Sequence, residues 1–202
     1  MEKAPLPSKF IKNIFVERKE LIKRVIEGKS TREDFLIGFL RHTPAVATYG
    51  PAGLNASIKG VGFIVKEEYL ETATNIILEQ LSRGVDRITA LKILLETVYD
   101  EDKVDFTKLT SIELAKKHTW VNVLENPEAT ILFYIPPNIT YEVRCTVTIH
   151  ENDIYWKYVN AVHDLFHGGR KARDWSKTPV YLFHIKEIYD NDPKLMGEKI
   201  YP

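Results

Sequence analysis

Two histidines, His163 and His167, stand four residues apart in a segment whose apolar spacing predicts a helix. At this spacing they share one helix face, one turn above the other. Two neutral imidazoles so placed can bind one metal ion, and a catalytic site of this kind needs a third protein ligand and an open position. The candidates for that ligand are His150, Glu151, Asp164 and His184. The alternative is that both histidines are ordinary half-buried polar residues.

Basic residues follow this predicted helix directly. Gly168 and Gly169 end the helix, and Arg170, Lys171 and Arg173 come next. The planar fork of an arginine matches phosphate oxygens, so this run is a candidate anion site. Basic residues after a helix also complement its dipole, which is the simpler reading.

Two further polar clusters lie elsewhere in the chain. Ser57 and Lys59, next to Gly60, fall on the polar face of a predicted strand. Residues 116–119, Lys-Lys-His-Thr, offer ammonium groups, an imidazole and a hydroxyl. Either cluster alone is typical of a solvated surface, and the two form one anion site only if the fold brings them together.

Hydrophobic spacing, capping residues and turns indicate the elements that position these groups. Helices are predicted at residues 9–27, 31–41, 67–83, 86–99, 110–124 and 153–167. Strands are predicted at residues 45–49, 54–65, 129–135, 140–150 and 180–188, and the tail from residue 189 is expected to be irregular. The start of the second helix rests on the capping box Ser30-Thr-Arg-Glu33, and that of the fifth on Thr110-Ser-Ile-Glu113.

This order of elements predicts an α+β fold. We expect a mostly antiparallel sheet or split β-barrel with N-terminal helices, in one domain spanning residues 1–202. Residues 67–125 are expected to form a helical block inserted between the strand regions.

Composition limits the classes of function. The 28 basic and 28 acidic side chains cancel, so we expect no nucleic-acid or membrane partner. The only cysteine, Cys145, cannot form an intrachain disulfide and is expected to be a buried apolar residue. No secretory signal or membrane span is evident, which favours a cytoplasmic protein. Few Gln and Met beside abundant Lys, Glu and Ile are typical of a thermophile.

Three segments carry a resemblance to a known family. They are Val46-Ala-Thr-Tyr-Gly-Pro-Ala-Gly-Leu-Asn-Ala-Ser-Ile-Lys-Gly60, residues 117–133 from Lys-His-Thr-Trp-Val-Asn to the strand after Asn-Pro, and Tyr141-Glu-Val-Arg-Cys-Thr-Val-Thr-Ile149. Together they resemble the FMN-binding split-barrel proteins related to pyridoxamine 5'-phosphate oxidase. In that family, an Ala-Thr strand, a glycine turn and a strand with a small polar residue before lysine or arginine line the flavin site.

The resemblance implies a cofactor, a set of ligands and an assembly. Ser57, Lys59, Lys117 and Thr119 would contact the phosphate and ribityl chain of FMN, and a homodimer would complete the pocket. The chain would then be an oxidoreductase acting on an unidentified small molecule. The helical block at 67–105 departs from the family, which has a strand and a short helix there.

Two alternatives from other classes remain open. The first is a metal-dependent hydrolase centred on His163 and His167, in which a divalent ion generates the nucleophilic water. The second is a non-catalytic binding or assembly protein, whose ten tyrosines and three tryptophans serve an interface.

Overall fold

Helices form the N-terminal part and the middle of the chain. The computed structural model describes residues 5–168 and 173–202. The first long helix is continuous through α1 (Ser8–Ile11), a π-helical turn (Lys12–Val16) and α2 (Glu17–Ile26). The others are α3 (Arg32–Leu40), α4 (Glu67–Arg83), α5 (Arg87–Thr97), α6 (His118–Glu125) and α7 (Ile154–Phe166). The helices predicted at 9–27, 67–83, 86–99 and 153–167 are confirmed.

The strands form one antiparallel sheet of eight strands. Its order is β2 (Asn55–Ile58), β1 (Ala45–Thr48), β5 (Glu128–Ile135), β6 (Ile139–His150), β7 (Val180–Asp190), β4 (Val104–Ile112) and β3 (Gly62–Val65), with β8 (Glu198–Tyr201) paired to β7. The path starts at β2 and ends at β3, so the sheet does not close on itself. The predicted α+β class is confirmed, and this open antiparallel sheet is consistent with a split barrel.

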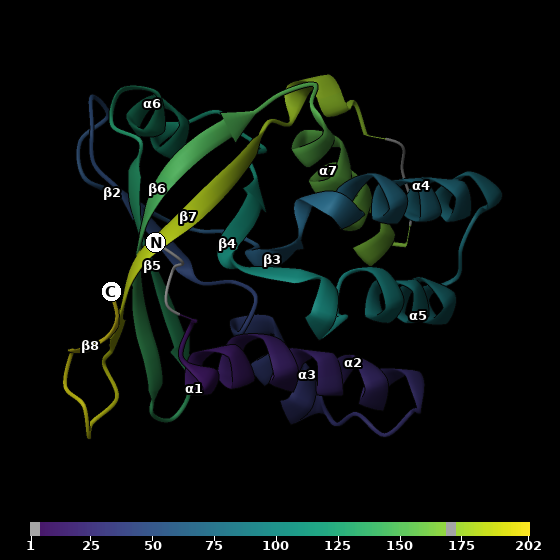
Figure 1. Ribbon diagram of the computed structural model, residues 1–202, viewed down its shortest axis with the longest axis horizontal. Helices are drawn as coiled ribbons and strands as arrows, with labels where there is room; N and C mark the ends of the chain where they lie inside the picture. Colours follow the sequence, from purple (N-terminus) through teal and green to yellow (C-terminus); the bar gives the residue numbers. More distant parts are fainter. Residues whose placement is uncertain (1–4, 169–172) are drawn as a thin grey trace.

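The helices are distributed unevenly around the sheet. Figure 1 shows α4, α5 and α7 together on one side, with α1, α2 and α3 below them. Helix α6 lies apart from the others and packs against β1 and β2. The sheet therefore separates a large helical layer from a small polar region around α6.

Aromatic packing fastens the N-terminal helix to the sheet. Phe10 is fully buried, and its ring meets those of Phe63, Phe133 and Tyr141 edge-on at centroid distances of 6.2, 6.1 and 5.1 Å. Edge-to-face pairs contribute about 0.5–1.5 kcal/mol each beyond the burial of their area. This cluster joins α1 to β3, β5 and β6.

Side-chain caps define the starts of three α-helices, α3, α5 and α7. The Asp86 carboxylate accepts hydrogen bonds from the first turn of α5, and Asp153 does the same for α7. Helix α3 has a capping box, but it is formed by Thr31 and Asp34 rather than by Ser30 and Glu33. The predicted box was wrong by one residue because the adjacent pairs Ser-Thr and Glu-Asp fit the same pattern in either register.

The predicted helix at residues 110–124 was wrong in its first half. Residues 104–112 form β4, which hydrogen-bonds to β3 on one side and to β7 on the other. Two long-range ladders satisfy the backbone better than a local capping box, so tertiary pairing overrides the local signal. Only α6 remains of this helix. The segment 67–125, expected to form an inserted helical block, contains this central strand.

Two strand predictions also need correction. The predicted strand at 54–65 is in fact two strands. β2 pairs with β1 and ends at Ile58, whereas β3 pairs with β4 and begins at Gly62. The tail from residue 189, expected to be irregular, continues β7 to Asp190 and returns as β8. Asp192 holds the connecting turn by accepting hydrogen bonds from the backbone N–H groups of Lys194 and Leu195.

Cys145 is buried, as predicted, and burial raises the pKa of its thiol to about 12. It therefore behaves as a small apolar residue.

In the part of the chain that the structure describes, no helix combines the length and apolar character needed to cross a bilayer.

Candidate functional site

Polar side chains of β2 and α6 meet at the edge of the sheet. Asn55 Nδ2 donates to Thr119 Oγ1 over 2.9 Å, and Ser57 Oγ lies 3.2 Å from the same oxygen. Thr119 is buried, whereas Asn55 and Ser57 are half-buried on the strand face turned toward α6. The structure thus brings Ser57 and Thr119 together, as a shared site requires.

The N-terminus of α6 lies at this meeting point. Its N-cap, Lys117, makes no side-chain capping hydrogen bond. The first N–H groups of a helix lack carbonyl partners within the helix, and the helix dipole favours an anion there. Lys116 is paired with Glu151 at 3.3 Å, whereas the exposed Lys117 has no ion pair within residues 5–168 and 173–202.

These groups form a donor set suited to a phosphate. Whichever of Ser57 and Thr119 donates in their mutual hydrogen bond, one hydroxyl hydrogen of the pair remains available. The backbone N–H groups of the first turn of α6 and the ammonium of Lys117 add further donors. We call this group, made of Asn55, Ser57, Lys117 and Thr119, the β2–α6 cradle.

Lys59 forms a buried ion pair with Glu113 next to the cradle. Its Nζ donates to Glu113 Oε2 over 2.9 Å, and the Tyr181 hydroxyl donates to the same oxygen at 2.9 Å. The other carboxylate oxygen accepts the backbone N–H groups of Ala115 and Lys116 at 2.7 and 2.8 Å. The side chains of Lys59 and Glu113 are 12% and 4% exposed. Contact between Lys59 and a flavin stays a prediction. To make it, the ammonium would have to bind the flavin and Glu113 together, or leave Glu113.

The electrostatics of Glu113 follow from these contacts. Burial alone would raise the pKa of its carboxyl group. Hydrogen bonds from Lys59, the Ala115 backbone and Tyr181 outweigh burial and hold the pKa below its ordinary value of 4.5. Glu113 is therefore ionised at neutral pH and joins the end of β4 to β2 and β7.

The predicted histidine pair lies at the end of α7, with His163 in the helix and His167 as its C-cap residue. The rings of His163 and His167 lie 4.5 Å apart between centroids. Burial and the nearby charge of Arg173 hold the pKa of His163 below its ordinary value of 6.5, so its imidazole is neutral at neutral pH. Across residues 5–168 and 173–202, however, no three His, Cys, Asp or Glu side chains are arranged to hold a metal ion. For the hydrolase alternative, the described residues thus supply two candidate metal ligands, His163 and His167, and no third protein ligand.

The other candidate histidines lie on β6 and β7. Nε2 of His150 and Nε2 of His184 are 2.9 and 3.0 Å from the same Thr148 hydroxyl. His150 Nδ1 also contacts the Asp153 carboxylate at 2.6 Å. Among the described residues the four histidines therefore form two pairs and not one metal site.

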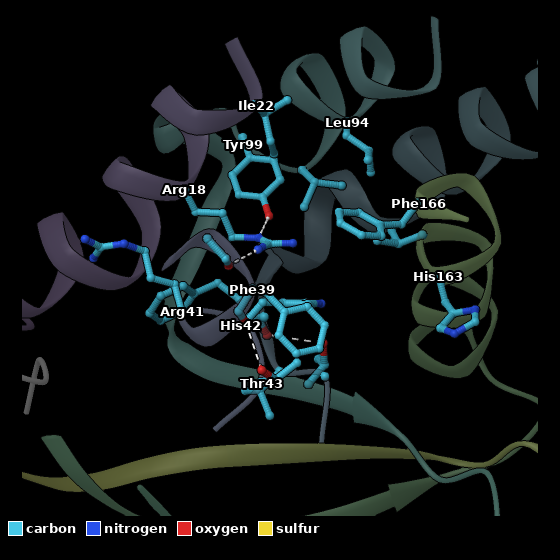
Figure 2. A pocket seen from close by; sticks show the side chains of 18 of the residues that line it. Arg18, Ile22, Phe39, Arg41, His42, Thr43, Leu94, Tyr99, His163 and Phe166 are labelled. Carbon is cyan, nitrogen blue, oxygen red and sulfur yellow. Dashed lines mark hydrogen bonds between the residues drawn. The ribbon is translucent and has the colours of Figure 1, made fainter. Parts of the chain in front are cut away.

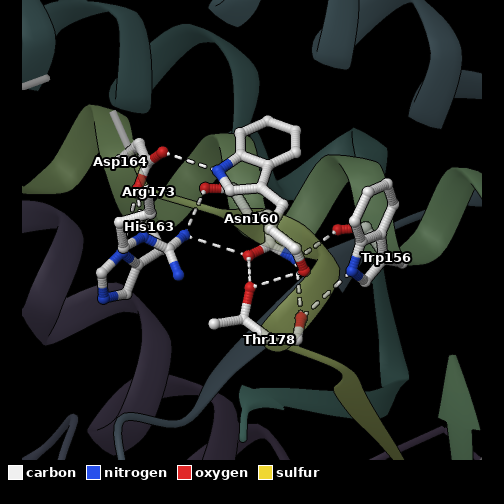
Figure 3. A network of polar contacts seen from close by, with 7 residues as sticks. Trp156, Asn160, His163, Asp164, Arg173 and Thr178 are labelled. Carbon is white, nitrogen blue, oxygen red and sulfur yellow. Dashed lines mark hydrogen bonds and ion pairs between the residues drawn. The ribbon is translucent and has the colours of Figure 1, made fainter. Parts of the chain in front are cut away.

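A polar network holds the segment after residue 172 against α7 (Figure 3). Arg173 Nε donates to Asp164 Oδ1 over 2.6 Å, and Trp175 Nε1 donates to the other carboxylate oxygen at 2.8 Å. Asn160, which is fully buried, accepts from Arg173 Nη2 and from the Thr178 hydroxyl at 3.0 and 2.8 Å. Arg173, one of three basic residues of the candidate anion site, is thus an ion-pair and hydrogen-bond partner of α7 residues. Arg170 and Lys171 lie outside the described residues.

Sequence reasoning missed several residues that carry this geometry. Neither Asn55 nor Asn160 was among the candidate site residues. Glu113 was assigned to a capping box, and no sequence signal marks a glutamate that becomes buried beside a lysine 54 positions earlier. Long-range pairing of this kind is visible only in the folded chain.

Comparisons with known proteins give structural matches but no sequence match. No protein-family model matches the chain, and no curated protein matches it in sequence. HupZ of group A Streptococcus superposes with a TM-score of 0.48 at 16% identity, covering 92% of this chain and 98% of its own. A pyridoxamine 5'-phosphate oxidase-related, FMN-binding protein of Nostoc punctiforme gives 0.48 at 11% identity, covering 100% of both chains. A protein of Listeria innocua described as a pyridoxamine 5'-phosphate oxidase gives 0.47 at 11% identity, covering 79% of this chain and 98% of its own.

Proposed function

We propose that this chain binds FMN, with the phosphate group at the β2–α6 cradle. The observation that supports this is the convergence of Ser57 and Thr119, from sequence segments about sixty residues apart, beside an uncapped helix N-terminus. The same residues belong to the segments that resemble the flavin-binding family. The hydroxyl and backbone donors bind phosphate oxygens, and the Lys117 ammonium balances their charge.

We further propose that the bound flavin serves an oxidoreductase acting on a small molecule. The flavin supplies the electron-transfer chemistry, and the protein supplies binding, orientation and electrostatics. Asn55 donates to the Thr119 oxygen and so holds this side chain in place beside Ser57. The Lys59–Glu113 ion pair holds the end of β2 against the loop before α6, which keeps both walls of the cradle in register.

A homodimer is part of the same proposal. In the register of the sheet, Ala45 of β1 is flanked by Ile58 of β2 and Leu132 of β5. Ile58 and Leu132 are 67% and 42% exposed. Further large apolar side chains are exposed on these strands, on the β1–β2 turn and on α6, namely Tyr49, Leu54, Val121, Leu124 and Tyr134. An exposed apolar area of this kind is typical of an interface. The resemblance to the flavin-binding family implies that a second chain packed here would complete the flavin pocket.

Replacing Leu132 by glutamate is therefore expected to yield a monomer, because a charge would be buried in the interface. Sedimentation velocity of the wild type should give twice the mass of one chain. The matched control is Ile88→Glu on α5, since Ile88 is 38% exposed and lies away from this face. A monomeric wild type, or a dimer that survives Leu132→Glu, would rule out this interface.

The cradle is tested by FMN titration of two variants. Lys117→Ala removes a charge-assisted contact, and Thr119→Val removes a hydroxyl without changing the side chain's shape. Each contact to an ionised group contributes about 1.5–3 kcal/mol, so the FMN dissociation constant should rise about 10- to 100-fold for Lys117→Ala. Quenching of flavin fluorescence measures the change.

The control for this titration is Lys157→Ala. Lys157 is an exposed lysine on α7, outside the cradle, and its removal alters the net charge by the same amount. It should leave FMN affinity unchanged. Equal affinities for the wild type and Lys117→Ala would show that the phosphate lies elsewhere.

A further inference from the structure

A second cavity lies inside the helical layer, away from the cradle. It has a volume of about 380 Å³ and is enclosed by the N-terminal helices, α5, α7 and the strands β3 and β4. Figure 2 shows side chains from these helices facing one another across it. Its walls are mostly apolar, with contributions from Phe15, Ile22, Leu94 and Val159. Pockets for small molecules span roughly 300–1,000 Å³ and have walls of this kind.

Arg18 brings a buried positive charge to this cavity. The residue is 7% exposed. Its Nε donates to the Tyr99 hydroxyl at 2.7 Å and its Nη1 to the carbonyl oxygen of Gly38 at 2.8 Å. Both partners are neutral, and Nη2 makes no hydrogen bond within the described part of the chain. A buried guanidinium normally has a carboxylate partner, because an uncompensated buried charge is destabilising.

The lining offers no carboxylate to neutralise Arg18. Among its described residues there is no Asp and no Glu, whereas Arg41 and Arg87 also line the cavity. Arg41 donates to the carbonyl oxygen of Asn13 and so has a neutral partner as well. The arginines of the lining therefore give the cavity a positive charge.

Two further polar atoms in the lining lack partners. Tyr158 is 2% exposed, and its hydroxyl has no hydrogen bond among the described residues. The backbone of Val65 is near enough to influence the pKa of Tyr158 but does not meet hydrogen-bond geometry. Nδ1 of His42 is also buried, and the backbone of Val61 is near enough to influence the pKa of His42 but does not meet hydrogen-bond geometry. The His42 ring lies stacked on Phe166 at 5.7 Å. Buried polar atoms without partners are rare in native proteins and indicate an absent ligand or water.

His42 contributes hydrogen bonding but no charge. Burial and the charge of Arg18 hold its pKa well below the ordinary value of 6.5. A neutral imidazole can accept or donate one hydrogen bond at each nitrogen according to its tautomer. Arg18 is thus the buried cation of this wall, since Arg41 is half-buried and Arg87 is exposed.

We propose that the cavity binds a small molecule with an apolar body and a single carboxylate, and that the carboxylate lies on Arg18. One carboxylate matches the one buried guanidinium of the lining, that of Arg18, whereas a phosphate dianion would bring a second negative charge that Arg18 alone does not neutralise. The planar carboxylate also fits the donors of Nη1 and Nη2. The apolar body occupies the space between α2, α5 and α7.

Access to this cavity is along exposed apolar side chains. Phe35 and Phe39 of α3 are 56% and 57% exposed, Leu114 is 65% exposed and Phe166 is 39% exposed, and all four line the cavity. An amphiphilic molecule would enter past these side chains. The lining includes none of Ser57, Lys117 and Thr119, so this site and the β2–α6 cradle can be tested separately.

The experiment is calorimetric titration of the full chain with octanoate, octan-1-ol and octylamine. These probes share one apolar body and carry a negative charge, no charge and a positive charge. Octanoate should bind about 10- to 100-fold more tightly than octan-1-ol, and octylamine should not bind. If octanoate bound no more tightly than octan-1-ol, or did not bind at all, the proposal would be overturned without reference to any variant.

Two substitutions locate the site. Arg18→Met keeps the apolar stem and removes the charge, so octanoate affinity should fall about 10- to 100-fold while octan-1-ol affinity stays the same. Val162→Phe fills the space beside the half-buried Val162 and should weaken both probes. Lys157→Ala is again the control. Unchanged octanoate binding in Val162→Phe would place the ligand outside this cavity.

Discussion

Replacing Glu113 by alanine is expected to lower the free energy of unfolding by about 3–5 kcal/mol. The carboxylate accepts four hydrogen bonds, from Lys59, Tyr181 and two backbone N–H groups, and is almost fully buried. Alanine would leave the Lys59 ammonium buried without a counter-ion. Urea denaturation followed by tryptophan fluorescence measures the change. A loss below about 1 kcal/mol, the value typical of an exposed ion pair, would contradict this account of the cluster.

The pH dependence gives an independent check on the same group. Because the folded-state pKa of Glu113 lies below its ordinary value of 4.5, its ionisation stabilises the protein fully above that value. This contribution is lost as the pH falls below 4.5 and through the lower folded-state pKa. Glu113→Gln removes the titrating group and keeps the side chain's shape. The difference in unfolding free energy between the wild type and Glu113→Gln should therefore shrink on acidification, and a constant difference would show that Glu113 does not titrate in this way.

Asp164→Ala should destabilise the protein by about 3 kcal/mol, since it removes the partner of both Arg173 and the Trp175 indole N–H. The side chains of Arg173 and Asp164 are 20% and 12% exposed, so solvent does not replace the lost contacts fully. The same urea denaturation reports the loss.

A double variant separates the charge from the packing in this network. Asp164→Ala combined with Arg173→Met leaves no unpaired charge, so it should be more stable than the sum of the two single losses predicts. Strict additivity would mean that the two side chains do not depend on each other.

The elements that the sequence predicted correctly are those with strong local signals. Helices α4, α5 and α7 have regular apolar spacing, and Asp86 and Asp153 start two of them as caps. Gly28 and Gly84 end helices with φ values of +69° and +74°, which only glycine adopts without strain. Strand β4 was missed because its signal is its place between β3 and β7, which the local pattern of Thr110 to Glu113 does not contain.

The candidate site was predictable only in part, for a similar reason. Ser57 and Thr119 were identified through a resemblance in short segments, and the fold brings them together at 3.2 Å. The partner of Lys59 was not predictable, because β2 and β4 do not pair in the sheet and only the folded chain brings Lys59 to Glu113. The apolar cavity around Arg18 was not foreseen either, since a basic residue in an amphipathic helix is usually exposed.

The most direct test of the central claim compares FMN with riboflavin on the wild-type protein. The two molecules share the ring and the ribityl chain and differ only in the phosphate, which the β2–α6 cradle is proposed to hold. Because several charge-assisted hydrogen bonds are lost together, FMN should bind at least about 100-fold more tightly than riboflavin. Equal affinities, or no binding of either flavin, would contradict the proposed function.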